Sequence, residues 1–119
     1  MSSIQIVLQD FEYARTLEAL FSGDGYAVTV RYSPDLNLGG VIVLDAGWMD
    51  RVEFGKHAER LVVITRRDAS INLADMWAAG IRSLVHREDP MENARLAILA
   101  AELRLRKRDS QQGPRPAWQ

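Results

Sequence analysis

Asp45 is the residue whose type and position most directly suggest chemistry. It follows the apolar run VIVL, Val41 to Leu44, and is itself followed by the turn-forming pair Ala46-Gly47. An aspartate in this position is either a reactive carboxylate, able to act as a nucleophile, or the polar residue at which a buried strand ends and which hydrogen-bonds the next turn. The local residues leave both interpretations open.

Other polar residues follow apolar runs in the same way. They are Gln9 and Asp10 after the first run, Thr65 at the end of the fourth and His86 after the fifth. Each also has a purely structural interpretation. Asp10 is a good helix N-cap, Thr65 is a β-branched residue suited to a strand, and His86 fits an exposed surface position.

The elements that must position these residues are short strands that alternate with helical segments. Buried strands are expected at Ile4–Leu8, Tyr26–Tyr32, Val41–Leu44 and Leu61–Thr65, with a weaker one at Arg82–Val85. Most of these runs are continuously apolar, which is typical of strands covered on both faces of a parallel sheet. Helices are predicted at Phe11–Phe21, Leu73–Ala79 and Met91–Arg108.

This alternation of strand and helix predicts a doubly wound α/β fold. In such sheets, ligands and chemistry gather at the carboxyl ends of the strands, where the polar residues above are expected to meet. Two crossovers are short: Ser33–Gly40 contains a proline and two glycines, and Asp50–Arg60 is interrupted by Gly55. We therefore expect the second and third helices of the fold to be short or absent.

The whole-chain properties narrow the class of protein. The chain of 119 residues fits one domain, expected over residues 1–108, with a flexible tail or linker stub at 109–119 that is rich in Gly and Pro. The net charge of −1 argues against direct nucleic-acid binding. The sequence has no apolar run long enough for a membrane span, no basic start typical of a secretory signal and no cysteine, so a cytoplasmic location is expected.

Taken in order, four segments resemble the receiver domains of two-component response regulators. The segments are IVLQDFEYARTLEALF, VIVLDAGW, LVVIT and AGIRSLVHREDP, and the resemblance runs from about Ile4 to Arg106. It implies a flavodoxin-like parallel sheet of five strands in the order 2-1-3-4-5. It also implies a signalling module of the phosphorelay type rather than an enzyme.

The resemblance gives roles to the polar residues. Asp45 matches the phosphoacceptor, whose carboxylate attacks a phosphoryl group, and Asp10 matches the second acid of the pair that holds Mg²⁺ together with Asp45. Thr65 matches the switch hydroxyl, and His86 falls where the family has a lysine that pairs with the phosphoryl group.

Three positions depart from the family pattern. Gln9 replaces the first acid of the pair, so Mg²⁺ is expected to bind weakly if it binds at all. His86 is shorter than lysine and less charged at neutral pH, while its neighbour Arg87 is expected to face the other way. Ser83 stands where the aromatic switch residue is expected.

The last helix carries apolar residues on two opposed faces. Ala94, Ala97, Ile98, Ala101 and Leu105 are spaced as a core face. An outer stripe is expected from Leu96, Leu99, Ala100 and Leu103. Scattered exposed leucines are common, but a continuous stripe favours contact with a protein partner or a second copy of the chain.

The leading interpretation is an atypical receiver that acts by protein–protein interaction, with aspartyl phosphorylation doubtful or lost. The alternative is a working phosphoacceptor modified at Asp45 by a histidine kinase. A small flavodoxin-like enzyme or nucleotide-binding protein is a third interpretation, and it has less support because neither GxGxxG nor GxxxxGK[ST] follows any expected strand.

Overall fold

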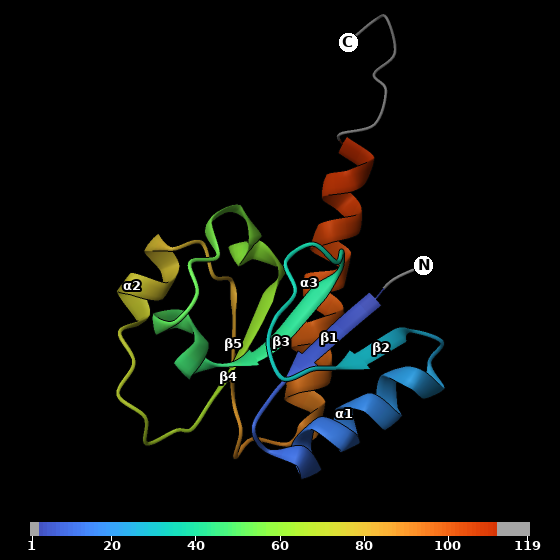
Figure 1. Ribbon diagram of the computed structural model, residues 1–119, viewed down its shortest axis with the longest axis horizontal. Coiled ribbons are helices and arrows are strands. Elements are labelled where there is room, and N and C mark those ends of the chain that lie inside the picture. Colours follow the sequence, from blue (N-terminus) through green and yellow to red (C-terminus); the bar gives the residue numbers. More distant parts are fainter. Residues whose placement is uncertain (1–2, 112–119) are drawn as a thin grey trace, which may run out of the picture.

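The computed structural model describes residues 3–111, and side chains as far as residue 107. The strands are β1 (Ser3–Val7), β2 (Ala27–Val30), β3 (Val41–Asp45), β4 (Leu61–Thr65) and β5 (Ser83–His86). The α-helices are α1 (Phe11–Gly23), α2 (Leu73–Ala78) and α3 (Met91–Gln111), and two short 3₁₀ helices are η1 (Ala46–Asp50) and η2 (Gly55–Arg60). The strands pair in parallel in the order β2-β1-β3-β4-β5, as Figure 1 shows. This confirms the predicted doubly wound α/β fold.

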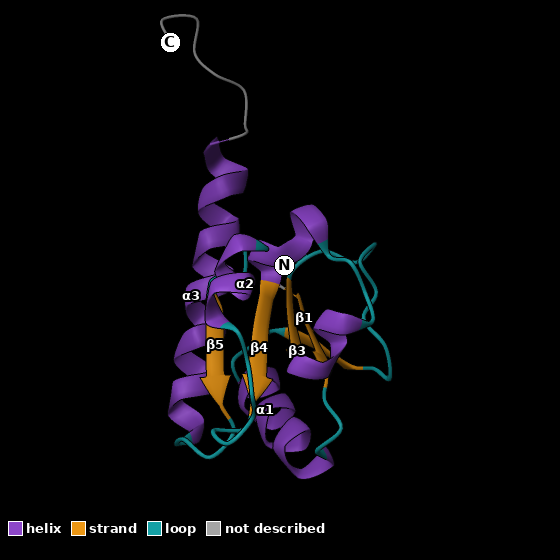
Figure 2. Cartoon of the chain, turned by 90° about the vertical axis from the view of Figure 1, so that its left-hand side faces the viewer, coloured by secondary structure: helices purple, strands orange, loops and turns teal. Residues whose placement is uncertain are grey.

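The central strands bury side chains on both faces of the sheet. On one face, residues such as Ile6, Val43 and Ile64 share a core cluster with α1 and α3. On the other face, residues such as Ile42 and Val63 pack with side chains of η1, η2 and α2. Figure 2 shows α3 along one side of the strands. This two-sided burial explains why these strands are continuously apolar in sequence.

β2 differs from the prediction of a buried strand. It is shorter than the expected Tyr26–Tyr32, and three of its four residues are exposed or nearly so, Val30 among them. The reason is its position at the edge of the sheet, where only Val28 and the preceding Tyr26 pack against the core cluster. An apolar run does not reveal whether its strand lies at the centre or the edge.

The crossovers expected to be short are short. No helix lies between β2 and β3, and the β3–β4 connection holds only the 3₁₀ helices η1 and η2.

Within the described chain, side chains hold the β2–β3 loop in place where the helix is missing. The amide of Gln5, buried in β1, donates to the Asp35 carbonyl at 2.7 Å and accepts from the Asp35 N–H at 2.9 Å. The Arg60 guanidinium donates to the carbonyls of Leu36 and Gly40 at 3.2 and 2.7 Å.

The core face predicted for the last helix is confirmed. Ala94, Ile98 and Ala101 are fully buried, while Ala97 and Leu105 are partly buried against the same cluster. The helix runs to Gln111, past its expected end at Arg108, so the expected tail at 109–119 begins as helix and its residues 112–119 lie outside the described part. No described helix is long and apolar enough to cross a membrane.

The outer stripe of α3 is narrower than predicted. Leu96 and Leu103 are 55% and 61% exposed, and Ala100 is exposed with them. Leu99 was wrongly assigned to this stripe, because it packs against the core cluster. The prediction placed residues around the helix at an ideal angle of rotation per residue. That method does not include the width of the sheet, which covers the flank of α3 as well as its inner face. The outer stripe of α3 therefore consists of Leu96, Ala100 and Leu103.

Candidate functional site

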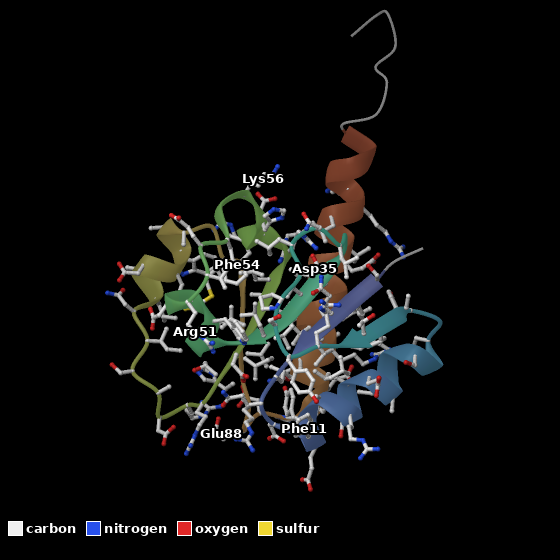
Figure 3. All side chains as sticks on the ribbon, in the orientation of Figure 1. Phe11, Asp35, Arg51, Phe54, Lys56 and Glu88 are labelled. Atoms are coloured by element: carbon white, nitrogen blue, oxygen red, sulfur yellow. The ribbon has the colours of Figure 1, made fainter. Side chains whose placement is uncertain are left out.

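The carboxyl ends of β1, β3, β4 and β5 meet at one edge of the sheet, and their polar residues surround an open depression of about 560 Å³. We refer to it as the Asp45 depression. The predicted residues that line it are Gln9, Asp10, Asp45 and Thr65. Figure 3 places Phe11 and Glu88 toward this end of the molecule and Lys56 at the opposite end. The topology thus brings together residues that are far apart in the sequence.

Asp45 does not behave as a simple strand-ending residue. It occupies the N-cap position of η1, yet its side chain makes no capping hydrogen bond there. Instead, its Oδ2 accepts the backbone N–H of Gln9 at 2.8 Å, across the sheet at the end of β1. The carboxylate therefore faces the depression rather than the turn that follows it.

The environment of Asp45 disfavours its charged form. Burial raises the pKa of the Asp45 carboxyl, and the nearby Asp10 carboxylate raises it further, while the Gln9 N–H and the Arg87 guanidinium act in the opposite direction. The net direction is upward. A carboxylate that is poorly solvated and near a second acid is the type of group that functional sites contain.

Asp10 has the capping role that its sequence position predicts. Its Oδ1 accepts the N–H of Tyr13 at 3.1 Å at the start of α1. Its Oδ2 forms an ion pair with the Arg87 guanidinium. Both carboxylate oxygens of Asp10 therefore already have partners within the described chain.

The cation that faces the acids is Arg87 and not His86. Arg87 lines the Asp45 depression, whereas His86 is absent from its lining and lies 3.8 Å from the Asp89 carboxylate, measured from Nδ1 to Oδ2. His86 is the last residue of β5 and Arg87 the first residue after it, and the two side chains contact different acids, Asp89 and Asp10. The error was in which of the two was placed on the site side.

Ser83, which stands where the aromatic switch residue is expected, is buried in β5. The Ser83 hydroxyl accepts a hydrogen bond from Arg104 of α3 at 3.0 Å, so it is part of the packing between β5 and α3.

Thr65 is 7% exposed at the end of β4 and lines the depression. Its hydroxyl has a hydrogen bond of 3.4 Å to the Arg66 carbonyl, which is long for an O–H donor. Its own carbonyl accepts the Arg87 N–H at 2.7 Å. The backbone of Thr65 is therefore well fixed, while its hydroxyl is held only weakly.

Arginines are the site residues that sequence reasoning missed. Arg51, Arg66 and Arg87 all line the Asp45 depression. Each follows an element directly: Arg66 comes after β4, Arg87 after β5 and Arg51 after η1. For Arg66 and Arg87, the position just beyond a strand end was the available signal, since such residues lie where the loops converge.

The residues present do not fit a Mg²⁺ site. Magnesium prefers several oxygen ligands in octahedral geometry, and the described residues contain no group of three acidic, histidine or cysteine side chains able to hold a metal ion. Gln9 brings no charge, and the Asp10 carboxylate is engaged by Arg87 and by the helix cap. Among the described residues that line this depression, Asp45 is a carboxylate without a cation in direct contact, and its Oδ2 accepts only the Gln9 N–H.

Comparison with known proteins finds solved structures of the same fold but no match in sequence. No protein-family model matches the sequence, and no curated protein matches it. Among solved structures, the response regulator StyR matches with a TM-score of 0.71 and 16% identity, covering 92% of this chain and 65% of that chain. FixJ-N matches with a TM-score of 0.64 and 18% identity, covering 87% of this chain and 94% of that chain.

These matches define the class of fold. The chain has the flavodoxin-like fold of response-regulator receiver domains, with sheet order 2-1-3-4-5 and short or 3₁₀ helices in the middle of the chain. It spans about two thirds of the StyR chain, 65% of its length. At this level of identity the similarity establishes the fold alone.

Proposed function

We propose that the chain is a non-enzymatic signalling module of the receiver class that acts by protein–protein contact, without Mg²⁺-dependent phosphorylation of Asp45. One observation carries the proposal: the Arg87 guanidinium forms an ion pair with Asp10, the residue that matches the metal-binding acid of receivers. A guanidinium is a permanent cation, so it neutralises Asp10 at any physiological pH. The site then has a built-in cation where the family uses a metal ion.

The charges around Asp45 also support the proposal that this aspartate is not phosphorylated. Transfer to a carboxylate brings a phosphoryl group, which is itself negatively charged, against Asp45, and the charge must be neutralised by positioned cations. Arg87 is already paired with Asp10, and burial disfavours the ionised, nucleophilic form of Asp45. Signalling by this module is therefore expected to depend on its contacts rather than on a modified aspartate.

The surface proposed for those contacts is the outer stripe of α3. Leu96 and Leu103 are more than half exposed, and Ala100 lies between them on the same side of the helix. Exposed leucines in one continuous stripe are a typical feature of interaction surfaces. We propose a second copy of the chain as the partner, with a different protein as the competing occupant.

A working phosphoacceptor is the second candidate function. It is favoured by the open depression, in which Asp45 lies beside Thr65 and near three arginines. In that case a histidine kinase is the expected donor, and arginine side chains take the place of the lysine and the metal ion in binding the phosphoryl oxygens.

Treatment with acetyl phosphate separates the two candidates. An Asp45 oxygen would attack phosphorus, the bond from phosphorus to the acetyl oxygen would break, and acetate would leave. We expect no phosphoryl adduct by intact-protein mass spectrometry, with or without Mg²⁺. An adduct that forms in the wild type and disappears in Asp45→Asn would overturn the leading proposal and establish the second.

A further inference from the structure

A second cleft, of about 400 Å³, opens beside the Asp45 depression. It lies at the carboxyl ends of β1 and β2, and Trp48 and Arg51, which follow β3, complete it. The cleft exists because the β2–β3 connection contains no helix to cover these strand ends. We refer to it as the aromatic cleft.

The position of the aromatic cleft is one that favours ligand binding. The chain runs from β1 outward to β2 on one side, and then returns to β3 on the other side of β1. This reversal is the topological switch point of a doubly wound sheet, and ligands of such sheets bind in the crevice outside the strand ends at that point. The volume of the cleft is also within the usual range of small-molecule sites.

The aromatic residues of the cleft are unusually exposed. Tyr32 is 90% exposed and Phe11 is 60% exposed, and the half-buried Trp48 lines the cleft with them. Figure 3 shows that Phe11 comes from the start of α1, well separated from Arg51. Three aromatic rings from three separate segments thus offer flat apolar surfaces for stacking with a planar ligand.

The charge of the cleft has one sign. Arg31 and Arg51 line it, and none of the described residues of its lining is acidic. The Arg51 guanidinium lies 4.4 Å from the centre of the Trp48 ring, so it is held close to an aromatic surface. The Arg31 guanidinium donates from Nε to the Ser33 carbonyl at 3.3 Å and forms a long ion pair of 3.9 Å with Asp35, and neither partner lines the cleft.

We propose that the aromatic cleft binds a planar aromatic anion of the mononucleotide type. Its ring would stack on the exposed rings of Tyr32 and Phe11, and its phosphate would be bound by Arg31 and Arg51. Guanidinium groups suit this role because they bind phosphate through paired hydrogen bonds and also stack on aromatic rings. The absence of a glycine-rich phosphate loop is consistent with recognition of the phosphate by side chains.

The test is isothermal titration calorimetry of the full chain with GMP and with FMN, each paired with its phosphate-free analogue, guanosine and riboflavin. We expect saturable binding of at least one nucleotide with a Kd between about 10 μM and 1 mM. The phosphate-free analogue should bind at least about tenfold more weakly, and added salt should weaken binding of the nucleotide. No saturation by either nucleotide at about 5 mM would overturn the proposal, because binding weaker than millimolar is not specific.

Variants locate the site. Arg51→Gln and Tyr32→Ala should each weaken nucleotide binding by about tenfold or more, and both residues are exposed enough to be replaced without unfolding the chain. Arg82→Gln is the matched control, since Arg82 lies over the Trp77 ring in the same way but outside the cleft. Equal weakening by Arg82→Gln, or none by Arg51→Gln, would overturn the assignment to this cleft.

Two further outcomes separate this proposal from its competitors. Asp45 does not line the cleft, so Asp45→Asn should retain nucleotide binding whatever its effect on phosphorylation. An acidic peptide containing aromatic residues is the alternative occupant. Arg51-dependent binding of such a peptide, with no binding of GMP or FMN, would assign the cleft to a protein partner and overturn the proposal of a small ligand.

Discussion

Arg87, the first residue after β5, forms an ion pair with Asp10, the first residue before α1. The contact joins two loops at the carboxyl edge of the sheet and places a guanidinium beside the acid that, in the family pattern, helps to hold a metal ion. The Arg87 side chain thus occupies one acid that a metal ion would need, and its charge also acts on the Asp45 carboxylate.

The first prediction is that Mg²⁺ binding can be restored by two substitutions. Gln9→Asp adds the missing carboxylate, and Arg87→Ala releases Asp10 from its ion pair. We expect the double variant to gain thermal stability on addition of Mg²⁺, while the wild type does not. At a Mg²⁺ concentration about 100-fold above Kd, the free energy of unfolding should rise by about 2.7 kcal/mol.

The control for this experiment keeps the ion pair broken but adds no charge. Gln9→Asn combined with Arg87→Ala releases Asp10 and supplies only an amide oxygen at position 9, so its stability should respond little to Mg²⁺. An equal response in the wild type and the double variant would contradict the conclusion that the native residues do not fit the metal.

The second prediction is that the charge of Asp45 lowers the stability of the folded chain. Burial raises the pKa of Asp45, so its ionised form is less favourable in the folded chain than in the unfolded chain. Asp45→Asn removes this charge and keeps an oxygen that can accept the Gln9 N–H. We expect the variant to be more stable at pH 7, by about 0.5 kcal/mol or more in urea unfolding.

The pH dependence provides the check on that explanation. Because the pKa of Asp45 is raised in the folded chain, the wild type regains stability as pH falls through that pKa toward the ordinary value of 3.8. The advantage of Asp45→Asn should therefore disappear. An advantage of Asp45→Asn that is constant with pH would show that the charge of Asp45 is not its cause.

The comparison variant at the second acid should have the opposite effect. Asp10→Asn should destabilise the chain at pH 7, because it leaves Arg87 without its partner.

The sequence was sufficient to predict the order of the elements and the edge of the sheet where polar residues meet. Apolar runs and helix caps are local signals, and Asp10 before α1 is one that the structure contains as predicted. The short crossovers were also predictable, because Pro34 and the glycines near it cannot support a helix.

The details of the site depended on register that the sequence does not specify. Strand β5 ends at His86, and the turn that follows it places Arg87 against Asp10, which the strand pattern of the sequence does not predict. Leu99 was misplaced for a related reason, since only the three-dimensional packing decides how much of α3 the sheet covers. The aromatic cleft had no signal in the sequence beyond the missing helix.

The third prediction is a loss of stability in mild acid that depends on His57. The Nδ1 of His57 lies 2.9 Å from Arg60, whose guanidinium also holds the β2–β3 loop through Gly40. Burial lowers the pKa of His57 below 6.5, and the positive charges of Arg60 and Lys56 lower it further. The folded chain therefore disfavours protonated His57.

The sign of the effect follows from this direction. A lowered folded pKa contributes stability that is fully present above 6.5 and is lost as pH falls through the folded pKa. Melting temperatures of the wild type should therefore fall more steeply between pH 6.5 and acid than those of His57→Gln. His86→Gln removes the other histidine of the chain and is the comparison variant: a loss in acid that is smaller in His57→Gln than in His86→Gln would assign the effect to His57.

The fourth prediction tests the outer stripe of α3. Leu103 is 61% exposed, so Leu103→Glu places a charge on the stripe without disturbing the core, whereas the same change at Leu99 would disturb packing. We expect the wild type to sediment as a species larger than one chain and Leu103→Glu as a single chain, because a carboxylate buried without a partner between two apolar surfaces is strongly unfavourable. Leu73→Glu on α2 is the matched control, since Leu73 is 54% exposed and lies outside the stripe, and it should sediment like the wild type. A wild type that remains a single chain at high concentration would exclude self-association as the use of this stripe and leave a different protein as its partner.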